Sequence, residues 1–118
     1  MSEIQEQYKL NFIKINYEGN KVYHRCNMTQ TNQESLALSD LLNYLGKYPE
    51  GLMDEIESAQ SGQDFDEIYS FDTAPGDFGL KIIPPNAIIE QMGYSYTISL
   101  IDLKELLEEW RLFGAIEN

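Results

Sequence analysis

The chain has 118 residues and a net charge of −12, with twenty acidic side chains against eight basic ones. This charge disfavours nucleic-acid backbones and anionic membranes as direct partners, because both would repel the chain, and it permits a basic protein partner. A hydrophobic content of 42% argues against a disordered chain, and the length predicts a single domain over residues 1–118. One cysteine excludes an internal disulfide. The absence of a signal peptide or a membrane-spanning apolar run leads us to expect a cytoplasmic protein.

The first predicted element is a β-hairpin over residues 8–26, with its turn at residues 18–20. The apolar positions of its first strand change parity after Phe12, and this predicts either a bulge or a strand buried on both faces. Those positions are Leu10 and Phe12 on one parity, then Ile13, Ile15 and Tyr17 on the other.

Two helices are predicted next, after a polar loop over residues 27–35. Ser39 is a suitable N-cap for the first helix, and leucines at helical spacing form its apolar stripe. Gly46 and Pro49 predict its end near Tyr48. The second helix covers about residues 50–59, with Leu52 and its neighbours on the inner face and acidic residues on the outer face.

Strands are predicted at residues 65–71, 78–83 and 94–100, with a turn at Pro75 and Gly76 between the first two. Residues 86–92 fit either a strand or one helical turn capped by Asn86, and we favour the strand. A final helix begins after Ser99, which forms an approximate capping box with Asp102, and Gly114 suits its C′ position.

The predicted order is therefore ββααβββ(β)α. This order indicates an α+β domain in which the helices cover one face of a single antiparallel sheet. Trp110 lies on the apolar stripe of the final helix and is expected in the core.

The acidic residues are concentrated in one interval of the sequence. Between Lys47 and Lys81 the chain has nine acids and no base. The nine are Glu50, Asp54, Glu55, Glu57, Asp64, Asp66, Glu67, Asp72 and Asp77. We expect a concentrated negative field on one part of the molecule.

The segment from residue 61 to 79 mixes these acids with aromatic residues. Its three phenylalanines are expected in the core, whereas Tyr69 is expected at a binding surface, where tyrosine is enriched. The predicted partner-binding residues are Asp64, Asp66, Glu67, Tyr69, Asp72 and Asp77.

No complete catalytic or metal motif accompanies these residues. A calcium loop starting at Asp64 fails at its fifth and sixth positions, which are Ile68 and Tyr69. His24 and Cys26 share one face of a strand, but no third residue would orient them as a catalytic dyad. We therefore expect no enzymatic activity, no metal and no cofactor, and a half-buried strand pair at His24 and Cys26.

Two functions fit this pattern. A protein that presents carboxylates and aromatic rings could block the phosphate-gripping Lys and Arg residues of a nuclease. In size, acidity, α+β order and the strand-to-helix segment TISLIDLKELLEEW at residues 97–110, the chain resembles the small acidic immunity proteins of bacterial toxin–immunity systems, including contact-dependent growth inhibition. The resemblance implies a cognate toxin, often a nuclease, that is bound tightly in the cytoplasm.

The alternative is a domain linked to a small molecule or a metal, including a minor enzyme, with Asp64, Asp66, Glu67 and His24 as candidates. A phage-type inhibitor that mimics nucleic acid would share the acidic surface and differ in its target. A gene beside this one that encodes a larger protein with a basic C-terminal domain would favour the immunity function.

Overall fold

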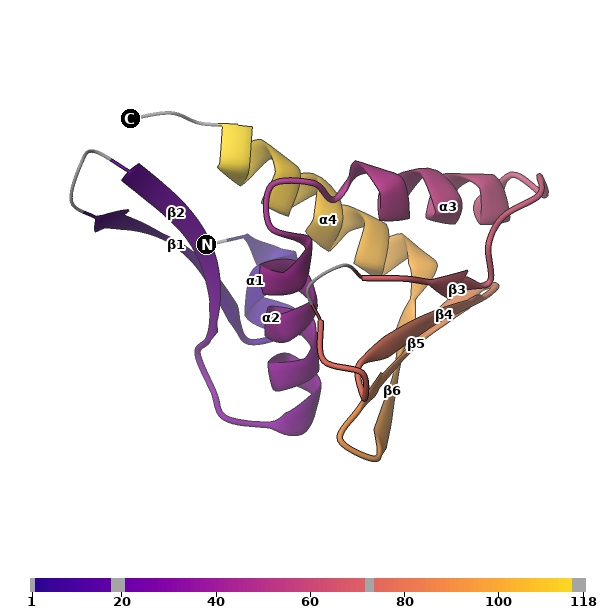
Figure 1. Ribbon diagram of the computed structural model, residues 1–118, viewed down its shortest axis with the longest axis horizontal. Coiled ribbons are helices and arrows are strands. Elements are labelled where there is room, and N and C mark those ends of the chain that lie inside the picture. Colours follow the sequence, from indigo (N-terminus) through magenta and orange to yellow (C-terminus); the bar gives the residue numbers. More distant parts are fainter. Residues whose placement is uncertain (1, 18–20, 72–73, 116–118) are drawn as a thin grey trace.

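Two antiparallel sheets enclose a layer of helices in the computed structural model of this chain (Figure 1). The structure describes residues 2–17, 21–71 and 74–115. Its elements are α1 (Glu3–Gln7), β1 (Leu10–Tyr17), β2 (Lys21–Met28), α2 (Gln33–Leu45), α3 (Glu50–Gln60), β3 (Ile68–Tyr69), β4 (Gly79–Ile83), β5 (Asn86–Gln91), β6 (Tyr94–Ser99) and α4 (Leu100–Ala115). The α+β class and the approximate order of the elements are confirmed.

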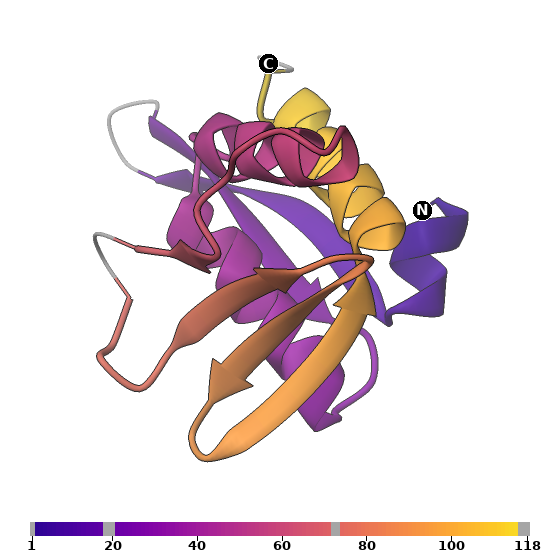
Figure 2. The ribbon, with the colours of Figure 1, turned by 90° about the vertical axis from the view of Figure 1, so that its right-hand side faces the viewer.

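The prediction of a single sheet is wrong. Strands β1 and β2 form a two-stranded sheet of their own, and β3, β4, β5 and β6 form a second sheet in that order. Helix α2 contacts both β2 and β5. Helix α4 contacts β5 and β6, and its Trp110 packs against Phe12 of β1, so both helices lie between the two sheets. Figure 2 shows the outer face of the four-stranded sheet without a helix over it.

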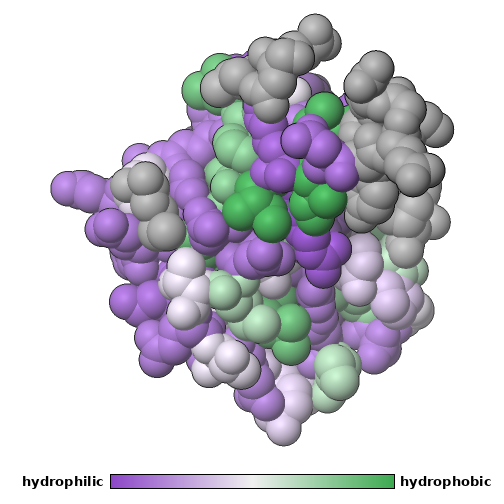
Figure 3. Space-filling view, turned by 90° about the vertical axis from the view of Figure 1, so that its left-hand side faces the viewer, coloured by the Kyte–Doolittle hydropathy of each residue, from purple (hydrophilic) through white to green (hydrophobic). Residues whose placement is uncertain are grey.

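The predicted hairpin is confirmed. Its strand pairing decides between the bulge and the strand with apolar residues on both faces that were predicted for residues 10–17. The register runs without interruption from Leu10 opposite Met28 to Tyr17 opposite Lys21, so the strand has no bulge. Leu10, Phe12 and Cys26 are buried against the helices, whereas Ile13 and Ile15 on the other face are only partly buried. Figure 3 shows this side of the molecule, with apolar residues bordered by hydrophilic ones. The predicted turn at residues 18–20 lies outside the described residues.

Helix α2 begins earlier than predicted. Its N-cap is Asn32, whose Oδ1 accepts a hydrogen bond of 2.8 Å from the backbone N–H of Ser35. Ser39 is buried inside the helix, where its hydroxyl donates to the carbonyl of Leu36. Asn32 and Ser39 are both residue types that can cap a helix. The helix begins at the earlier one, because the first turn is also held by Ser35, whose hydroxyl donates to the carbonyl of Tyr8. The helix ends at Leu45, since Gly46 adopts a positive φ of 57°.

The C-terminal half agrees more closely with the sequence. Residues 86–91 form strand β5, as favoured, and the Ser99 Oγ accepts from the backbone N–H of Asp102 at 3.1 Å, as expected of an N-cap. The predicted strand at 65–71 is reduced to Ile68 and Tyr69. Gly114 lies inside α4, which continues to Ala115, so its predicted C′ role is wrong.

Helix α1 was not predicted, because it is short and offers one buried apolar residue, Ile4. It is held against the final helix by polar contacts. The Ser2 hydroxyl caps α1 and donates to Glu109, and the Tyr8 hydroxyl donates to Asp102 at 2.5 Å. These contacts join the two ends of the described chain.

The core fills the space between the sheets. Its members from the two helices and the four-stranded sheet are almost fully buried: Leu38, Leu41 and Leu42 of α2, Leu103, Leu106 and Leu107 of α4, and Leu80, Ile82 and Ile89 of the sheet. Phe78 is also buried, and Phe65 and Phe71 pack against the core, as expected for the three phenylalanines of the acidic segment.

Candidate functional site

The exposed side of α3 carries an acidic row. Glu50, Asp54 and Glu57 are exposed, and their spacing of four and three residues places them on one side of the helix. Leu52 and Ile56 are fully buried on the opposite side, so packing fixes the direction in which the row points.

The loop that follows α3 adds three more acids. Asp64, Asp66 and Glu67 are all exposed. The backbone N–H of Asp66 donates to Glu55 Oε2 of α3 at 3.0 Å, so the loop folds back beside the helix. The two acidic segments thereby lie on and beside α3, with Glu55 about 100° around the helix from Asp54. We call these acids together the acidic surface, and its residues are Asp54, Glu55, Glu57, Asp64, Asp66 and Glu67.

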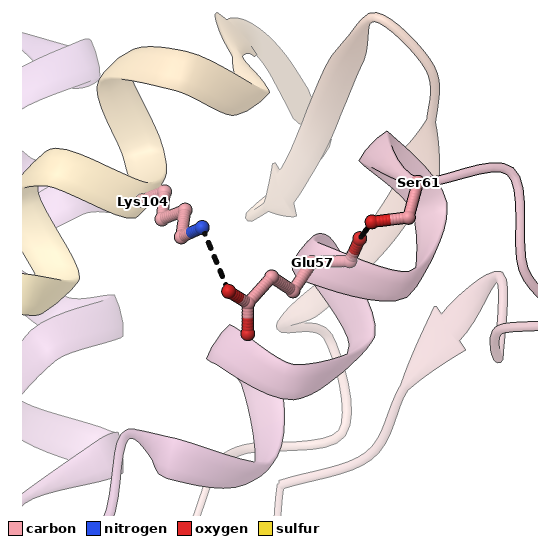
Figure 4. A network of polar contacts seen from close by, with 3 residues as sticks. All are labelled: Glu57, Ser61 and Lys104. Atoms are coloured by element: carbon pink, nitrogen blue, oxygen red, sulfur yellow. Dashed lines mark hydrogen bonds and ion pairs between the residues drawn. The ribbon is translucent and has the colours of Figure 1, made fainter.

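A shallow hollow lies beside two residues of the acidic surface, Asp54 and Glu57. The hollow has a volume of about 300 Å³ and is lined by Asp54, Glu57, Ser58, Ser61 and Gln63. Figure 4 shows the contacts of two of these residues: Lys104 Nζ of α4 lies 3.3 Å from Glu57 Oε1, and the Ser61 hydroxyl donates to the Glu57 carbonyl at 2.8 Å. The Glu57 side chain remains 62% exposed in this ion pair. An exposed pair of this kind contributes little stability, so the carboxylate remains accessible to a partner.

The remaining predicted site residues are not part of this surface. Asp77 is exposed but lies near α2, where burial, followed by the charges of Asp40 and Asp77, raises the pKa of Tyr44. Asp72 lies outside the described residues. The structure therefore brings together three of the five predicted carboxylates.

Tyr69 is directed inward. Its ring packs edge-on against Phe71 at a centroid distance of 5.0 Å. Its hydroxyl lies close to the start of α3, since a Cβ built on Gly51 would be 3.1 Å from that oxygen. The neighbouring Ile68 is 63% exposed and is the apolar side chain that β3 presents to solvent.

Sequence reasoning did not select Ile68 or the acids of α3 as site residues. The signals were present, because side chains alternate along a strand and because Glu50, Asp54 and Glu57 recur at helical spacing. The contact between Asp66 and Glu55 could not be predicted from the sequence, because it depends on the path of the loop after α3.

His24 and Cys26 share the inner face of β2, as predicted. Cys26 is 1% exposed, and burial raises the pKa of its thiol to about 12, so it remains protonated at neutral pH. Its backbone N–H and carbonyl are both hydrogen-bonded to the side chain of Asn43. His24 is half-buried and packs edge-on against Phe113 at 5.6 Å. This arrangement supports packing and provides no activated nucleophile.

Two other kinds of feature, a cluster of metal ligands and a membrane-spanning helix, are absent from the described parts of the chain. Across residues 2–17, 21–71 and 74–115, no three His, Cys, Asp or Glu side chains lie together as metal ligands would. No helix among these residues has the length and apolar character needed to cross a membrane. Comparison with known protein families, curated proteins and solved structures gives no match.

Proposed function

We propose that this protein is an immunity protein that neutralises a cognate toxin by binding a basic domain of it, most simply a nuclease. The observation that carries the proposal is the acidic surface, in which the hydrogen bond between Asp66 and Glu55 joins the loop to α3. Five exposed carboxylates and the half-buried Glu55 gather there on and beside α3, and Asp54 and Glu57 line a hollow.

The chemistry of the surface suits a partner that grips phosphate. Nuclease sites gather Lys and Arg, and carboxylates placed at phosphate-like spacing can occupy the same cations. Opposite fields also raise the rate of encounter by roughly 10- to 1,000-fold. The exposed Ile68, near the loop, offers an apolar contact beside the charged ones.

The alternative small-molecule or metal-linked function has less support. Its four candidate residues were Asp64, Asp66, Glu67 and His24. His24 lines a cavity that none of the three acids lines. No group of three His, Cys, Asp or Glu side chains in the described parts of the chain is placed to hold a metal ion.

Co-expression with the toxin tests the proposed function. The proposal expects a neighbouring gene to encode a toxin with a basic C-terminal domain. That domain is produced in a bacterial host, with or without this protein, and growth is measured. We expect the wild-type protein to restore growth and the variant Asp64→Asn/Asp66→Asn/Glu67→Gln to restore much less.

A matched variant, Glu3→Gln/Glu6→Gln/Glu34→Gln, removes the same charge from α1 and the start of α2, away from the acidic surface, and should protect as the wild type does. Circular dichroism checks that both variants are folded. Full protection by the folded acidic-surface variant would contradict the proposal. Inhibition of an unrelated nucleic-acid-binding protein, with no effect on the neighbouring toxin, would instead indicate a nucleic-acid mimic.

A further inference from the structure

A mostly apolar groove opens at the C-terminal end of α3. It has a volume of about 560 Å³, and its lining comes from the end of α3, the β4–β5 turn and the start of α4: Ala59, Gln60, Pro84, Pro85, Leu100 and Ile101. We call it the apolar groove, because Gln60 is the one polar residue of that lining. An apolar cavity of about 150 Å³ is enough to hold a benzene ring, so the apolar groove has room for a large apolar side chain.

The walls of the apolar groove are held in place by contacts of the fold itself. The backbone N–H of Leu100 donates to the carbonyl of Pro85 at 3.0 Å, which fixes the β4–β5 turn against the first turn of α4 (Figure 2). The ion pair between Lys104 and Glu57 joins α4 to α3 one helical turn further in. Ala59 and Leu100 are buried in the core. The groove therefore exists before any partner arrives.

Exposed apolar side chains surround the opening of the apolar groove. Ile101 is 74% exposed, and Ile83, which precedes Pro84 in the chain, is 43% exposed. Pro84 and Pro85 are exposed as well. Neighbouring apolar residues that remain exposed inside a polar rim are typical of an interaction site.

The acidic surface borders the apolar groove on two sides. Of residues 58–61, the two serines line the hollow beside Asp54 and Glu57, and the other two line the groove. The carbonyl of Glu67 accepts a hydrogen bond of 2.7 Å from the backbone N–H of Ile82. This contact places the acidic loop beside the end of β4 that leads into the groove.

The charges around the apolar groove are negative on balance. Lys81 and Lys104, which are bases of the adjoining elements, are each paired with a glutamate at 3.3 Å. The last turn of α3 has no basic residue, so the partial negative charge of this helix end is not balanced by its own side chains. At the start of α4, by contrast, the Ser99 cap and the carboxylate of Asp102 balance the positive helix end. A partner that carries positive charge complements these surroundings.

We propose that the apolar groove receives an apolar side chain of a basic protein, from a segment in which lysine or arginine residues flank that side chain. This inference rests on the proposed function, because the basic partner that meets the acidic surface also covers the groove beside it. An apolar anchor in a pocket, with charged groups around it, supplies most of the binding energy in many interfaces. The charges mainly set the rate of association, and the anchor slows dissociation.

Short peptides test the apolar groove without the toxin. Three peptides are titrated into isotope-labelled protein and followed by NMR of backbone amides and isoleucine methyl groups. The first has a leucine between two pairs of lysines, the second a serine between the same lysines, and the third a leucine between two pairs of serines. We expect the first peptide to shift the signals of Gln60 and Ile101 along a saturable curve, and to bind at least about fivefold more tightly than either of the others.

Two variants make the peptide test specific. Ile101→Ala removes an exposed side chain of the groove and should weaken binding of the lysine–leucine peptide at least about fivefold. Leu112→Ala, at a 51% exposed position of the same helix, lies about 16 Å further along α4 and should leave binding unchanged. Equal responses of the two variants, or equal binding of the leucine and serine peptides with lysines, would overturn the proposal. Equal binding of the two leucine peptides would also overturn it, because the groove would then take apolar ligands regardless of charge.

The toxin separates this inference from the proposed function. The basic domain that a neighbouring gene is expected to encode is immobilised, and binding is followed by surface plasmon resonance. Ile101→Ala should dissociate at least about tenfold faster with an unchanged association rate, whereas Asp64→Asn/Asp66→Asn/Glu67→Gln should associate more slowly. Native kinetics of Ile101→Ala, beside weaker binding of the acidic-surface variant, would overturn the role of the groove and leave the proposed function standing. Failure of the wild type to bind this domain would overturn the proposed function, and the peptide titrations would then decide the role of the groove by themselves.

Discussion

Trp110 is predicted to be the residue on which the packing of the final helix depends most. It is 2% exposed, its ring lies 5.0 Å from Phe12 of β1, and it stacks on Phe113 at 6.2 Å. Its Nε1–H donates to the carbonyl of Gly46 at 2.7 Å. One side chain thereby ties α4 to the hairpin and to the end of α2.

The expected cost of Trp110→Ala follows from these contacts. Truncating a buried tryptophan costs about 3–5 kcal/mol, because apolar contacts are lost and a cavity remains. Trp110→Phe keeps an aromatic ring and loses the hydrogen bond to Gly46, which contributes about 1 kcal/mol. A domain of this kind is stable by about 5–15 kcal/mol, so the alanine variant loses a large share of its stability. The melting temperature should fall by about 12–20 °C, at about 4 °C per kcal/mol.

Guanidinium unfolding followed by circular dichroism measures these changes, since the alanine variant has no tryptophan fluorescence. The order of stability should be wild type, then Trp110→Phe, then Trp110→Ala. Leu112→Ala, at a 51% exposed position of the same helix, serves as the control and should change stability by no more than about 0.5 kcal/mol. An unfolding midpoint of Trp110→Ala equal to that of the wild type would refute the packing described for α4.

Three further predictions concern other parts of the fold. Leu100→Ala should lower the free energy of unfolding by about 2–5 kcal/mol, because Leu100 is only 2% exposed. Ile101→Ala should lower it by no more than about 0.5 kcal/mol, because Ile101 is 74% exposed. Similar unfolding midpoints for the two variants would mean that α4 is rotated about its axis. Cys26 should react slowly with a thiol reagent in the native protein, since it is buried and burial raises the pKa of its thiol to about 12. In denaturant the reagent should detect one thiol per chain. An immediate reaction of the native protein would contradict the burial of Cys26. Burial and the hydrogen bond to Asp102 raise the pKa of Tyr8, so its contribution to stability is complete below about pH 10 and is lost progressively as the pH rises towards the raised pKa. Tyr8→Phe should therefore lose less stability than the wild type between pH 9 and pH 11, and an equal loss in the two proteins would contradict this; the raised pKa of Cys26 leaves some dependence in both.

The sequence predicts best those elements that have a strong repeat and an unambiguous cap. Ser99 is followed by apolar residues at helical spacing as far as Trp110, and α4 forms where this pattern indicates. Strand β5 alternates between buried and half-buried residues, because one face of its sheet packs against the helices and the other does not. In both cases local preference and tertiary packing agree.

Other elements depend on contacts that the sequence does not display. Helix α1 is too short to form a repeat and is held by Asp102 and Glu109, about a hundred residues away. The hairpin separates from the other strands because α2 lies between them, and strand patterns do not specify which sheet a strand joins. For the site, charge distribution predicted the exposed acids at 64–67, but the inward direction of Tyr69 follows from its packing beside Gly51.

The central claim, that the acidic surface binds a basic partner, is tested most directly by affinity at two salt concentrations. The basic domain encoded by the neighbouring gene is immobilised, and binding is measured by surface plasmon resonance at 0.1 M and 1 M salt, where the Debye length is about 10 Å and 3 Å. We expect association to slow at high salt, and Asp64→Asn/Asp66→Asn/Glu67→Gln to bind more weakly and with a smaller salt dependence than the wild type. Native affinity and native salt dependence in that variant, once it is shown to be folded, would mean that the acidic surface is only solvated.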